Sequence, residues 1–372
     1  MELAARRMGR MFEQGLAAAH TGGGDYMPLR IYLLRGLSFL VQPLGGAFYD
    51  PVPPITNFLI KLPSLLALLA TVVLLFVWSR RWRGTAGATL IAALYALAPP
   101  VWMNAAWWGQ VDVLLTLPML AAIVLLDQAR GRWSWFCWGL GLLIKPQAVI
   151  LAPLMYVATL RRHGCRGLAE GGGILASMLI AAATPIVLAS QGPGLYQAAA
   201  GSVGRFPVVT NRAYNLWYLV AQDRPVSDIA NYVGVLSYRT IGLLLVGVVA
   251  LLVLLALWRR PDSLMRAKCA AVLALAFFVL PTQIHERYAF FALPFLLLVA
   301  AAHRSLLLPF FVLCTTATIN NLGAIGGFWP DAQDWIRAGL LPLIVAWTNI
   351  VVLVALVGHM LWMASRTGGK KT

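Results

Sequence analysis

Long apolar runs, separated by short polar stretches, follow one another along almost the whole chain. A straight membrane-spanning helix needs roughly 17–25 residues of this kind. Several runs are shorter, notably the two on either side of residues 145–147, and short helices suit a protein-lined cavity better than direct contact with lipid. The pattern predicts an all-α, polytopic transmembrane helical bundle of about 11 spans, at residues 56–78, 85–101, 108–127, 133–145, 147–160, 167–187, 236–257, 267–281, 288–302, 304–321 and 340–363.

The composition excludes an ordinary soluble protein. Of the 372 residues, 60% are hydrophobic and 11% are charged, and the mean hydropathy is +0.77. Soluble domains carry about a quarter charged residues. Because the predicted spans follow one another through short connections, the length indicates one membrane domain rather than two soluble domains.

The basic residues gather in short clusters at the ends of the predicted spans. A net charge of +16 could suggest a nucleic-acid partner, but short basic loops are typical of the cytoplasmic side of a membrane protein. Strict alternation places on that side the C-terminal tail and the loops near 80–83, 128–132, 161–166, 258–268 and 303–304. The outer face then receives residues 1–55, 102–110, 145–147, 188–235, 282–287 and 322–339. We therefore expect membrane lipids, and no nucleic acid, as partners.

The outer face includes the N-terminus. This divides the chain into an external N-terminal segment, residues 1–55, and a multi-span membrane domain, residues 56–372, with an external loop at 188–235. The N-terminal segment carries three arginines within its first ten residues and contains no signal peptide. Because a basic segment is not expected to cross a membrane unaided, we expect that a preceding span is missing from this chain.

The motifs that hold common cofactors are absent from the sequence. The four cysteines show neither CxxC nor CxxH spacing, so neither a disulfide framework nor a zinc site is expected. There is no GxxxxGK[ST] loop and no credible dinucleotide fingerprint. We therefore expect no cofactor and no metal.

Five polar segments map to the predicted outer face. They are Asp25-Tyr26-Met27-Pro28-Leu29, Trp107-Trp108-Gly109-Gln110-Val111-Asp112, Lys145-Pro146-Gln147, Asn211-Arg212-Ala213-Tyr214-Asn215-Leu216-Trp217 and Gln283-Ile284-His285-Glu286-Arg287-Tyr288. The chain has only 13 acidic residues, so finding Asp25, Asp112 and Glu286 on one face is informative. Ionisable residues at membrane depth usually face a cavity and have a function.

Four of the five segments also have a structural explanation. Asp25 could cap a helix that begins near Pro28. Lys145 could extend its ammonium group toward the membrane surface, and residues 285–287 could neutralise one another. The tryptophans could form an interfacial belt. The occurrence of all five segments on one face favours a functional site formed by the external loops.

Cations and a few carboxylates at the outer membrane boundary suit a lipid-phosphate donor. Lys145, Arg212 and Arg287 are predicted to bind the donor phosphate and offset charge on the leaving group. A single carboxylate would accept the proton from an acceptor hydroxyl. The predicted substrate-binding residues are Tyr26, Trp108, Gln110, Asp112, Gln147, Asn215 and Gln283.

These segments resemble motifs of the GT-C superfamily of membrane glycosyltransferases, which use polyprenyl- or dolichyl-phosphate sugars. The nearest likeness is to the dolichyl-phosphate-glucose-dependent glucosyltransferases of N-glycan assembly and their bacterial relatives. Asp25–Leu29 is similar to their DYPPL-like box, with Met27 in place of a proline. Residues 108–112 are similar to the WGQxD-like box, and residues 285–287 to the HEK-like motif, with arginine in place of lysine.

The resemblance implies a GT-C fold and metal-independent transfer of a hexose to a hydroxyl of a lipid-linked or envelope glycan or glycolipid. It implies that Asp25, His285 and Glu286 are the catalytic residues, with Asp25 as the base. The chain departs from the family pattern, because it begins after the position of the family's opening span and of another upstream acidic residue. Asp25 is therefore the candidate base in this chain, and an acidic residue before residue 1 is the alternative.

Two alternatives remain open at this point, a lipid or solute transporter and a non-catalytic membrane subunit. A transporter would carry polar residues near the midplane, often in paired repeats, whereas the polar segments here lie at one interface. The Ala-, Arg- and Gly-rich composition suggests a bacterial inner membrane with the site facing the periplasm.

Overall fold

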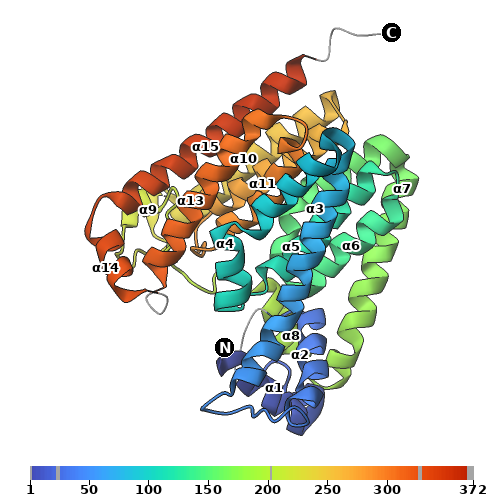
Figure 1. The fold of residues 1–372 in the computed structure, drawn as a ribbon, viewed down its shortest axis with the longest axis vertical. Helices are drawn as coiled ribbons and strands as arrows, with labels where there is room; N and C mark the ends of the chain where they lie inside the picture. Colours follow the sequence, from blue (N-terminus) through green and yellow to red (C-terminus); the bar gives the residue numbers. More distant parts are fainter. Residues whose placement is uncertain (1, 22–25, 202, 326–328, 367–372) are drawn as a thin grey trace. The chain divides into compact units, whose positions relative to one another are not determined.

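The computed structural model describes residues 2–21, 26–201, 203–325 and 329–366, and these are almost entirely helical (Figure 1). The chain divides into two compact units, each described here by itself. Unit 1 contains Met1–Thr71, Trp102–Val149 and His163–Val203, and unit 2 contains Val72–Val101, Ile150–Arg162 and Gly204–Thr372. The predicted boundary at residue 55 concerns membrane sidedness, so it stays a prediction.

Unit 1 contains the N-terminal helices and a helical hairpin. Its elements are α1 (Glu2–Gln14), η1 (Gly15–Ala18), α2 (Pro28–Val41), the first part of α3 (Pro54–Ala96), the π-helix η2 (Met103–Trp108), α5 (Asp112–Asp127), α6 (Gly131–Ile144), the beginning of η3 (Pro146–Leu151), the second part of α7 (Ala152–Leu188) and α8 (Gly192–Ala200). The hairpin is formed by α5 and α6, which pack against each other.

Unit 2 is built around two buried helices, α11 (Ser263–Val279) and α12 (Ala292–Ala300). Every residue of α12 is buried, as expected for a short helix that is apolar all round. The remaining elements include the short α4 (Pro99–Trp102) and α9 (Tyr218–Ala221), the hairpin of β1 (Asn231–Val233) and β2 (Leu236–Ser237), α10 (Tyr238–Arg259), η4 (Tyr288–Phe291), η5 (Arg304–Leu306), α13 (Leu307–Ala324), α14 (Pro330–Ala338) and α15 (Leu341–Ser365).

Glycines interrupt the two longest helices. Gly84 in α3 has φ +61°, and Gly164 in α7 has φ +65°, and both have non-helical ψ. Positive φ is readily adopted by glycine because it has no Cβ. Both breaks lie in basic clusters where the sequence predicts a connection between spans, so this prediction is confirmed.

Among the residues that the structure describes, five helices are long and apolar enough to cross a membrane, at Pro54–Ala96, Pro146–Leu188, Tyr238–Arg259, Arg304–Ala324 and Leu341–Ser365. This confirms a multi-pass helical membrane protein. Other predicted spans are helical but shorter, such as α5 with 16 residues and α6 with 14. The count of about 11 spans therefore stays a prediction.

No membrane span is predicted in residues 1–55, and a helix near Pro28 was only one of two explanations for Asp25. The described part of this segment contains the helices α1 and α2. Helix α1 is strongly amphipathic and buries Ala4, Ala5, Met8 and Met11. Its apolar positions follow helical spacing, but the run is too short and too polar to stand out as a membrane span.

Candidate active site

In unit 1, the segment Trp107–Asp112 forms a tight connection between two helices. The π-helix η2 ends at Gly109, which has φ +71°, a left-handed conformation that favours glycine. The backbone N–H of Gln110 donates to the carbonyl oxygen of Asn104 at 2.8 Å. The Ser64 hydroxyl donates to the Gln110 carbonyl oxygen at 2.8 Å, which fixes the segment to α3. The glycine of the WGQxD-like box is thus favoured by the backbone conformation.

Asp112 and Lys145 form a buried ion pair. The Asp112 Oδ1 lies 3.2 Å from the Lys145 Nζ, and the two side chains are 0% and 4% exposed. The Asn104 Nδ2 donates to the other carboxylate oxygen at 2.9 Å. Two of the predicted segments are therefore brought together, but their charges face each other. Donor-phosphate binding by Lys145, or substrate binding by Asp112, would require this pair to open, and both stay predictions.

The predicted helix break at Lys145–Gln147 is confirmed. Helix α6 ends at Ile144, and Lys145 adopts an extended conformation with φ −160° and ψ 137°. A residue before proline is restricted to this region. Gln147 lies half-buried in the 3-10 helix that follows.

The first predicted segment is only partly described. Asp25 lies outside the described residues. Tyr26 is 9% exposed, and its ring is contacted by the guanidinium groups of Arg7 and Arg30, at 4.1 and 3.7 Å from the ring centroid. Helix α2 begins at Pro28 with Met27 at the N-cap position.

The tryptophans of unit 1 differ in their exposure. Trp108 is half-buried, whereas Trp102 and Trp107 are exposed and stack with a centroid distance of 5.9 Å. Exposed tryptophans next to membrane helices are typical of an interfacial belt. Substrate binding by Trp108 stays a prediction.

In unit 2, the two remaining predicted segments lie side by side. The backbone N–H of Asn211 donates to the Ile284 carbonyl oxygen at 2.9 Å, and that of Gln283 donates to the Val208 carbonyl oxygen at 3.2 Å. The Asn211 Nδ2 is 3.3 Å from the His285 imidazole nitrogens. The structure therefore joins these two loops, which are far apart in the sequence.

His285, Glu286 and Arg287 form a compact charged group. The Glu286 carboxylate is 2.8 Å from the Arg287 Nη1 and 3.6 Å from the His285 Nδ1. Burial raises the pKa of Glu286, but its interaction with His285 and the charge of Arg287 outweigh burial and hold the pKa below its usual value. Glu286 is therefore ionised and already paired, which makes it a poor proton acceptor and supports a positioning role.

The ring of His285 is held edge-on by two aromatic neighbours. Its centroid lies 4.9 Å from that of Phe206 and 5.5 Å from that of Tyr288. These contacts fix the plane of the imidazole, so its nitrogens point in defined directions.

Arg212 is exposed and has φ +60°, which is unusual for a residue other than glycine. Its Nη1 donates to the Ala324 carbonyl oxygen at 3.0 Å, and its own carbonyl oxygen accepts from the Asn320 Nδ2 at 2.8 Å. Within the described part of the chain, Arg212 forms no ion pair with an acidic side chain. Its charge is therefore available to an anionic ligand.

The side chain of Asn215 is held by the protein itself. It is fully buried, its Nδ2 donates to the Phe278 carbonyl oxygen at 3.2 Å, and its Oδ1 accepts from the Trp217 backbone N–H at 3.1 Å. Both ends of the amide stabilise the loop, and substrate binding by Asn215 stays a prediction.

Asp228 was missed by the sequence analysis. It is fully buried and accepts hydrogen bonds from Arg239 at 2.8 and 2.9 Å, from Thr282 at 3.0 Å and from Gln283 at 2.6 Å. Burial raises the pKa of Asp228, but these hydrogen bonds lower it below its ordinary value. The one sequence signal was an acidic and a basic residue, Asp228 and Arg239, on either side of ten uncharged residues.

Gln283 completes this network. Its Nε2 donates to Asp228, and its Oε1 accepts from the Gly204 backbone N–H at 2.7 Å. Gln283 has φ +65°, so the turn before His285 is held in a conformation that non-glycine residues rarely adopt. Gln283 positions the loop, and its predicted contact with substrate is untested.

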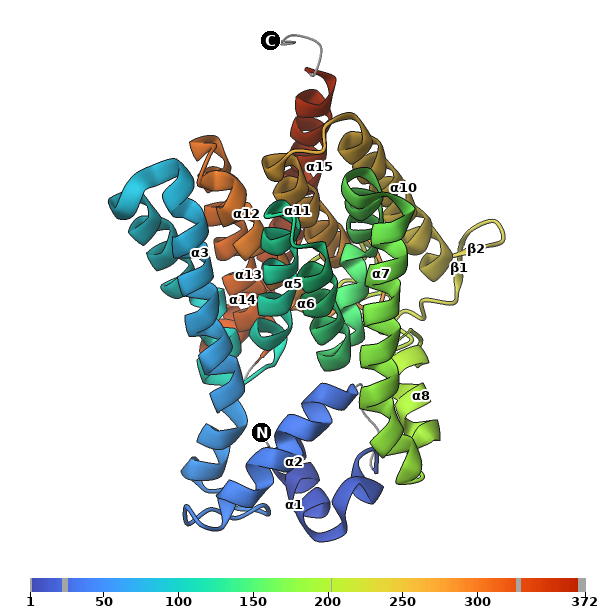
Figure 2. The ribbon, with the colours of Figure 1, turned by 90° about the vertical axis from the view of Figure 1, so that its right-hand side faces the viewer.

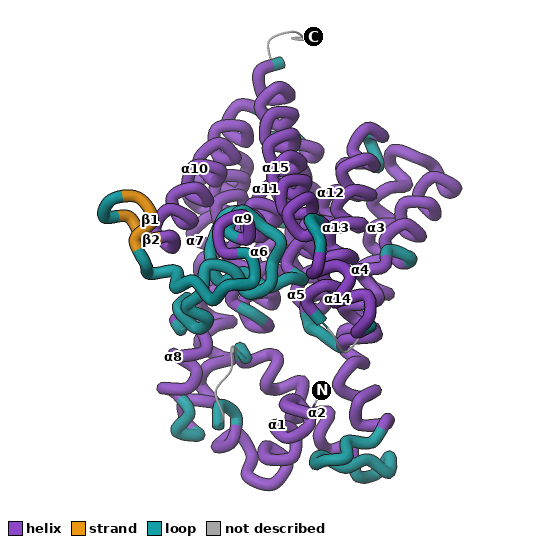
Figure 3. The backbone as a smooth tube through the Cα atoms, turned by 90° about the vertical axis from the view of Figure 1, so that its left-hand side faces the viewer, coloured by secondary structure: helices purple, strands orange, loops and turns teal. Residues whose placement is uncertain are grey.

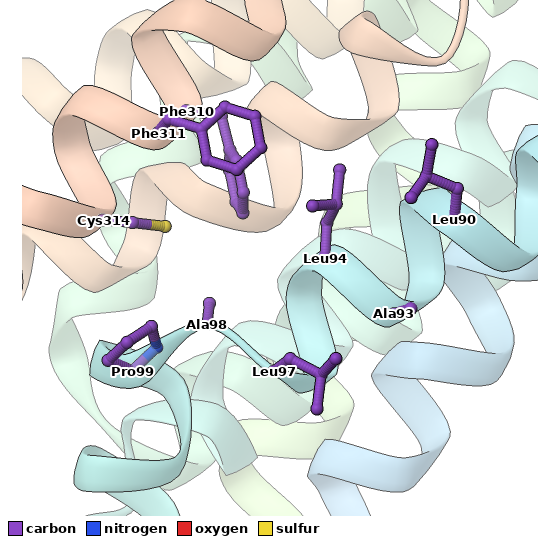
Figure 4. Close-up of a pocket in the computed structure, with 9 residues that line it drawn as sticks. All are labelled: Leu90, Ala93, Leu94, Leu97, Ala98, Pro99, Phe310, Phe311 and Cys314. Carbon is purple, nitrogen blue, oxygen red and sulfur yellow. The ribbon is translucent and has the colours of Figure 1, made fainter.

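An apolar pocket of about 220 Å³ lies in unit 2 between α3 and α13 (Figure 4). It is lined by Leu90, Ala93, Leu94, Leu97, Ala98, Pro99, Phe310, Phe311 and Cys314. This lining suits a hydrocarbon chain and has no charged group for a phosphate. The candidate catalytic and phosphate-binding residues of unit 2 therefore lie outside this pocket, on the loops that contain Arg212 and His285.

Comparison with solved structures identifies the class of fold. The chain is similar to ArnT from Cupriavidus metallidurans, whose crystal structure is bound to undecaprenyl phosphate, with a TM-score of 0.52 and 17% sequence identity. The match covers 96% of this chain and 72% of that one. The chain thus has the fold of a GT-C membrane protein, as the resemblance implied.

Comparison with family models identifies the family. The model of Glycosyltransferase family 87 matches residues 52–281, more than half of the chain. The chain belongs to this family and is a membrane glycosyltransferase. No curated protein matches it.

Proposed function

We propose that this protein transfers a hexose from a polyprenyl-phosphate-linked donor to a hydroxyl of a lipid-linked or envelope glycan, at the outer face of a bacterial inner membrane. The observation that carries the proposal is the joined pair of loops in unit 2, which presents Arg212, His285 and Arg287 in a family 87 glycosyltransferase. The fold shared with ArnT, a protein whose structure holds undecaprenyl phosphate, supports this class of donor.

In the proposed reaction, the acceptor hydroxyl oxygen attacks the anomeric carbon of the donor sugar. The bond between that carbon and the phosphate oxygen breaks, and polyprenyl phosphate leaves. The hydroxyl proton passes to a carboxylate, for which Asp25 is our candidate. A sugar phosphate already carries a good leaving group, so the reaction needs cations that stabilise the phosphate charge.

The contacts in unit 2 suggest different tasks for its three polar groups. Arg212 is exposed and unpaired with any acidic side chain in the described chain, so it binds the donor phosphate in our proposal. Arg287 is paired with Glu286 and supplies a second, partly neutralised cation. His285, with its ring fixed by Phe206 and Tyr288, donates to a phosphate oxygen.

The first experiment is sugar transfer by the purified chain in lipid nanodiscs, with a panel of synthetic polyprenyl-phosphate hexoses and glycolipid acceptors. Asp25→Asn should abolish transfer, and addition of EDTA should leave the parent rate unchanged if the reaction is metal-independent. Folded protein without transfer from any donor would refute the proposal and favour the non-catalytic subunit. Family membership already favours the glycosyltransferase over the transporter.

The phosphate role of Arg212 has a matched control in the same loop. Arg224 is also exposed, and its guanidinium also donates to backbone carbonyl oxygens, those of Val220 and Ala221. Arg212→Ala should raise the donor KM about 10-fold, the loss of one charged hydrogen bond, and Arg212→Lys should restore part of it. Arg224→Ala should leave the KM unchanged. Equal effects of the two alanine variants would contradict the assignment.

A further inference from the structure

The hairpin formed by β1 and β2 exposes an unusual concentration of apolar side chains. The ten residues 229–238 contain no charged residue. Five large side chains in this stretch are exposed: Ile229 (62%), Tyr232 (51%), Val233 (59%), Val235 (89%) and Leu236 (38%). Exposed apolar patches of this kind mark contact surfaces with proteins or membranes.

The hairpin is held firmly at its base. The Asp228–Arg239 ion pair closes it, and the Arg239 backbone N–H donates to the Asp228 carbonyl oxygen at 2.8 Å. The rings of Tyr232 and Tyr238 stack at 4.7 Å, and Trp217 packs edge-on against both. A short two-stranded hairpin is marginally stable by itself, so these contacts explain why its apolar tip can be presented in a defined position.

The position of the hairpin indicates which partner its exposed apolar residues contact. Ser237 is the N-cap of α10, which is long and apolar enough to cross a membrane, so the hairpin adjoins the end of this candidate span. It projects sideways from the end of α10 (Figures 2 and 3). The lipid-facing side of α10 continues from it through exposed side chains at Leu243, Leu244, Val248, Leu251 and Leu255. Tyr232 in the hairpin is 51% exposed, and tyrosine is enriched at membrane interfaces.

We propose that residues 229–237 insert into the interfacial region of the lipid bilayer beside α10 and hold the adjacent loop at the membrane surface. The absence of charge favours lipid over a charged protein partner. The apolar tip at Val235 would lie among the upper acyl chains, and the Asp228–Arg239 pair would stay at the level of the headgroups.

The Asp228–Arg239 pair at the foot of the hairpin also connects the hairpin to the His285 loop. Asp228 accepts hydrogen bonds from Thr282 and Gln283, which precede His285 by two or three residues. A hairpin fixed in the membrane would therefore fix the height of His285 relative to the lipid phosphates. This consequence rests on the proposed function, whereas insertion itself does not.

Fluorescence quenching in nanodiscs tests insertion without using activity. The full-length chain, with Cys137→Ser and Cys165→Ser, carries an NBD label at Val235→Cys. Leu244→Cys on the lipid-facing side of α10 is the membrane control, and Arg130→Cys in an exposed basic turn is the water control. We expect lipids with a doxyl group at carbon 5 to quench the label at 235 at least half as strongly as that at 244. Aqueous iodide should quench the label at 130 alone.

Strong iodide quenching at 235, equal to that at 130, would overturn the proposal. Protection from both quenchers, with energy transfer between differently labelled chains, would also overturn it and identify a second copy as the occupant.

A second experiment measures transfer activity. It uses the double variant Val233→Thr with Val235→Thr, which weakens lipid contact and keeps strand geometry. These changes should raise the KM several-fold for a long-chain polyprenyl donor and leave that for a short, water-soluble donor unchanged. Quenching at 235 with no transfer by any chain would retain the insertion and refute the proposed function.

Discussion

The buried pair of Asp112 and Lys145 leads to a quantitative prediction. The charged atoms lie 3.2 Å apart with almost no exposure to solvent. At an effective dielectric constant of about 20, unit charges at this separation attract by about 5 kcal/mol. Desolvation of the two charges offsets much of that attraction, so the pair itself adds little to stability. Removal of one partner is costly because it leaves the other charge buried.

Asp112→Asn and Lys145→Met should each lower the free energy of unfolding by about 3–5 kcal/mol. The double variant leaves no buried charge, so its loss should be smaller than the sum of the single losses by about 2–3 kcal/mol. Asn104 can still donate to the amide oxygen of an asparagine at 112, which limits the loss in the free energy of unfolding for Asp112→Asn.

The assay is SDS-driven unfolding of the purified protein in detergent micelles, followed by tryptophan fluorescence. The matched control is the exposed pair of Arg132 and Glu170, 2.9 Å apart with side chains 70% and 33% exposed. Arg132→Met and Glu170→Gln should show a coupling of only about 0–1 kcal/mol because water screens the charges. Additive losses for Asp112 and Lys145, within about 0.5 kcal/mol, would refute the reasoning.

Transfer rates of the same four proteins separate folding from function. If the double variant recovers both stability and transfer, the pair is structural, and the prediction that Lys145 binds phosphate is wrong. If stability recovers and transfer does not, one of the two charges acts on the substrate. A single Lys145→Ala variant could not make this distinction, since loss of folded protein would hide any loss of chemistry.

Three further predictions concern the loops. Asp228→Ala should lower the free energy of unfolding by about 3 kcal/mol in the same SDS titration, near the low end for a buried pair because Arg239 is 27% exposed. Asp228→Asn keeps the size of the side chain and should lower the free energy of unfolding by less. Equal losses for the two variants would contradict this expectation. Gly109→Ala should cost about 1–2 kcal/mol because φ is +71°, and a neutral effect on thermal unfolding would show that the turn can rearrange. Because the pKa of Glu286 is held below its ordinary 4.5, its stabilising effect is lost as pH falls through the lowered pKa; the stability difference between the parent and Glu286→Gln should shrink as the pH is lowered below 4.5, and a difference that grows there would refute the assignment.

Helix positions in this protein could be predicted well from apolar runs and basic clusters. The breaks at Gly84 and Gly164 lie where arginines cluster, because positive charge and a chain reversal both belong at the end of a span. The amphipathic α1 was not predicted because the residues of its apolar face, Ala4, Ala5, Met8 and Met11, are separated by polar positions along the sequence. Hydropathy averaged over a span-length window does not detect such a face.

The candidate site was predictable only in part. The sequence placed residues 211–217 and 283–288 on one face, and the structure joins them through backbone hydrogen bonds. The sequence could not show that the Asn215 side chain donates to the Phe278 carbonyl oxygen in α11, or that Asp228 accepts a hydrogen bond from Gln283. Both depend on contacts between residues more than 50 positions apart, which residue type and spacing do not encode.

Most of the charged residues that the sequence predicts to be functional form ion pairs with one another. Lys145 is paired with Asp112, and Arg287 with Glu286, so two of the three predicted phosphate-binding cations are wholly or partly neutralised. A protein that must keep such groups in or near a membrane gains from pairing them, since an isolated buried charge is costly. Arg212, whose side-chain partner is a carbonyl oxygen, retains its full charge because it lies on an exposed turn. Exposure and missing charge compensation, rather than the presence of a cation in a motif, therefore identify the residue best placed to attract an anionic donor.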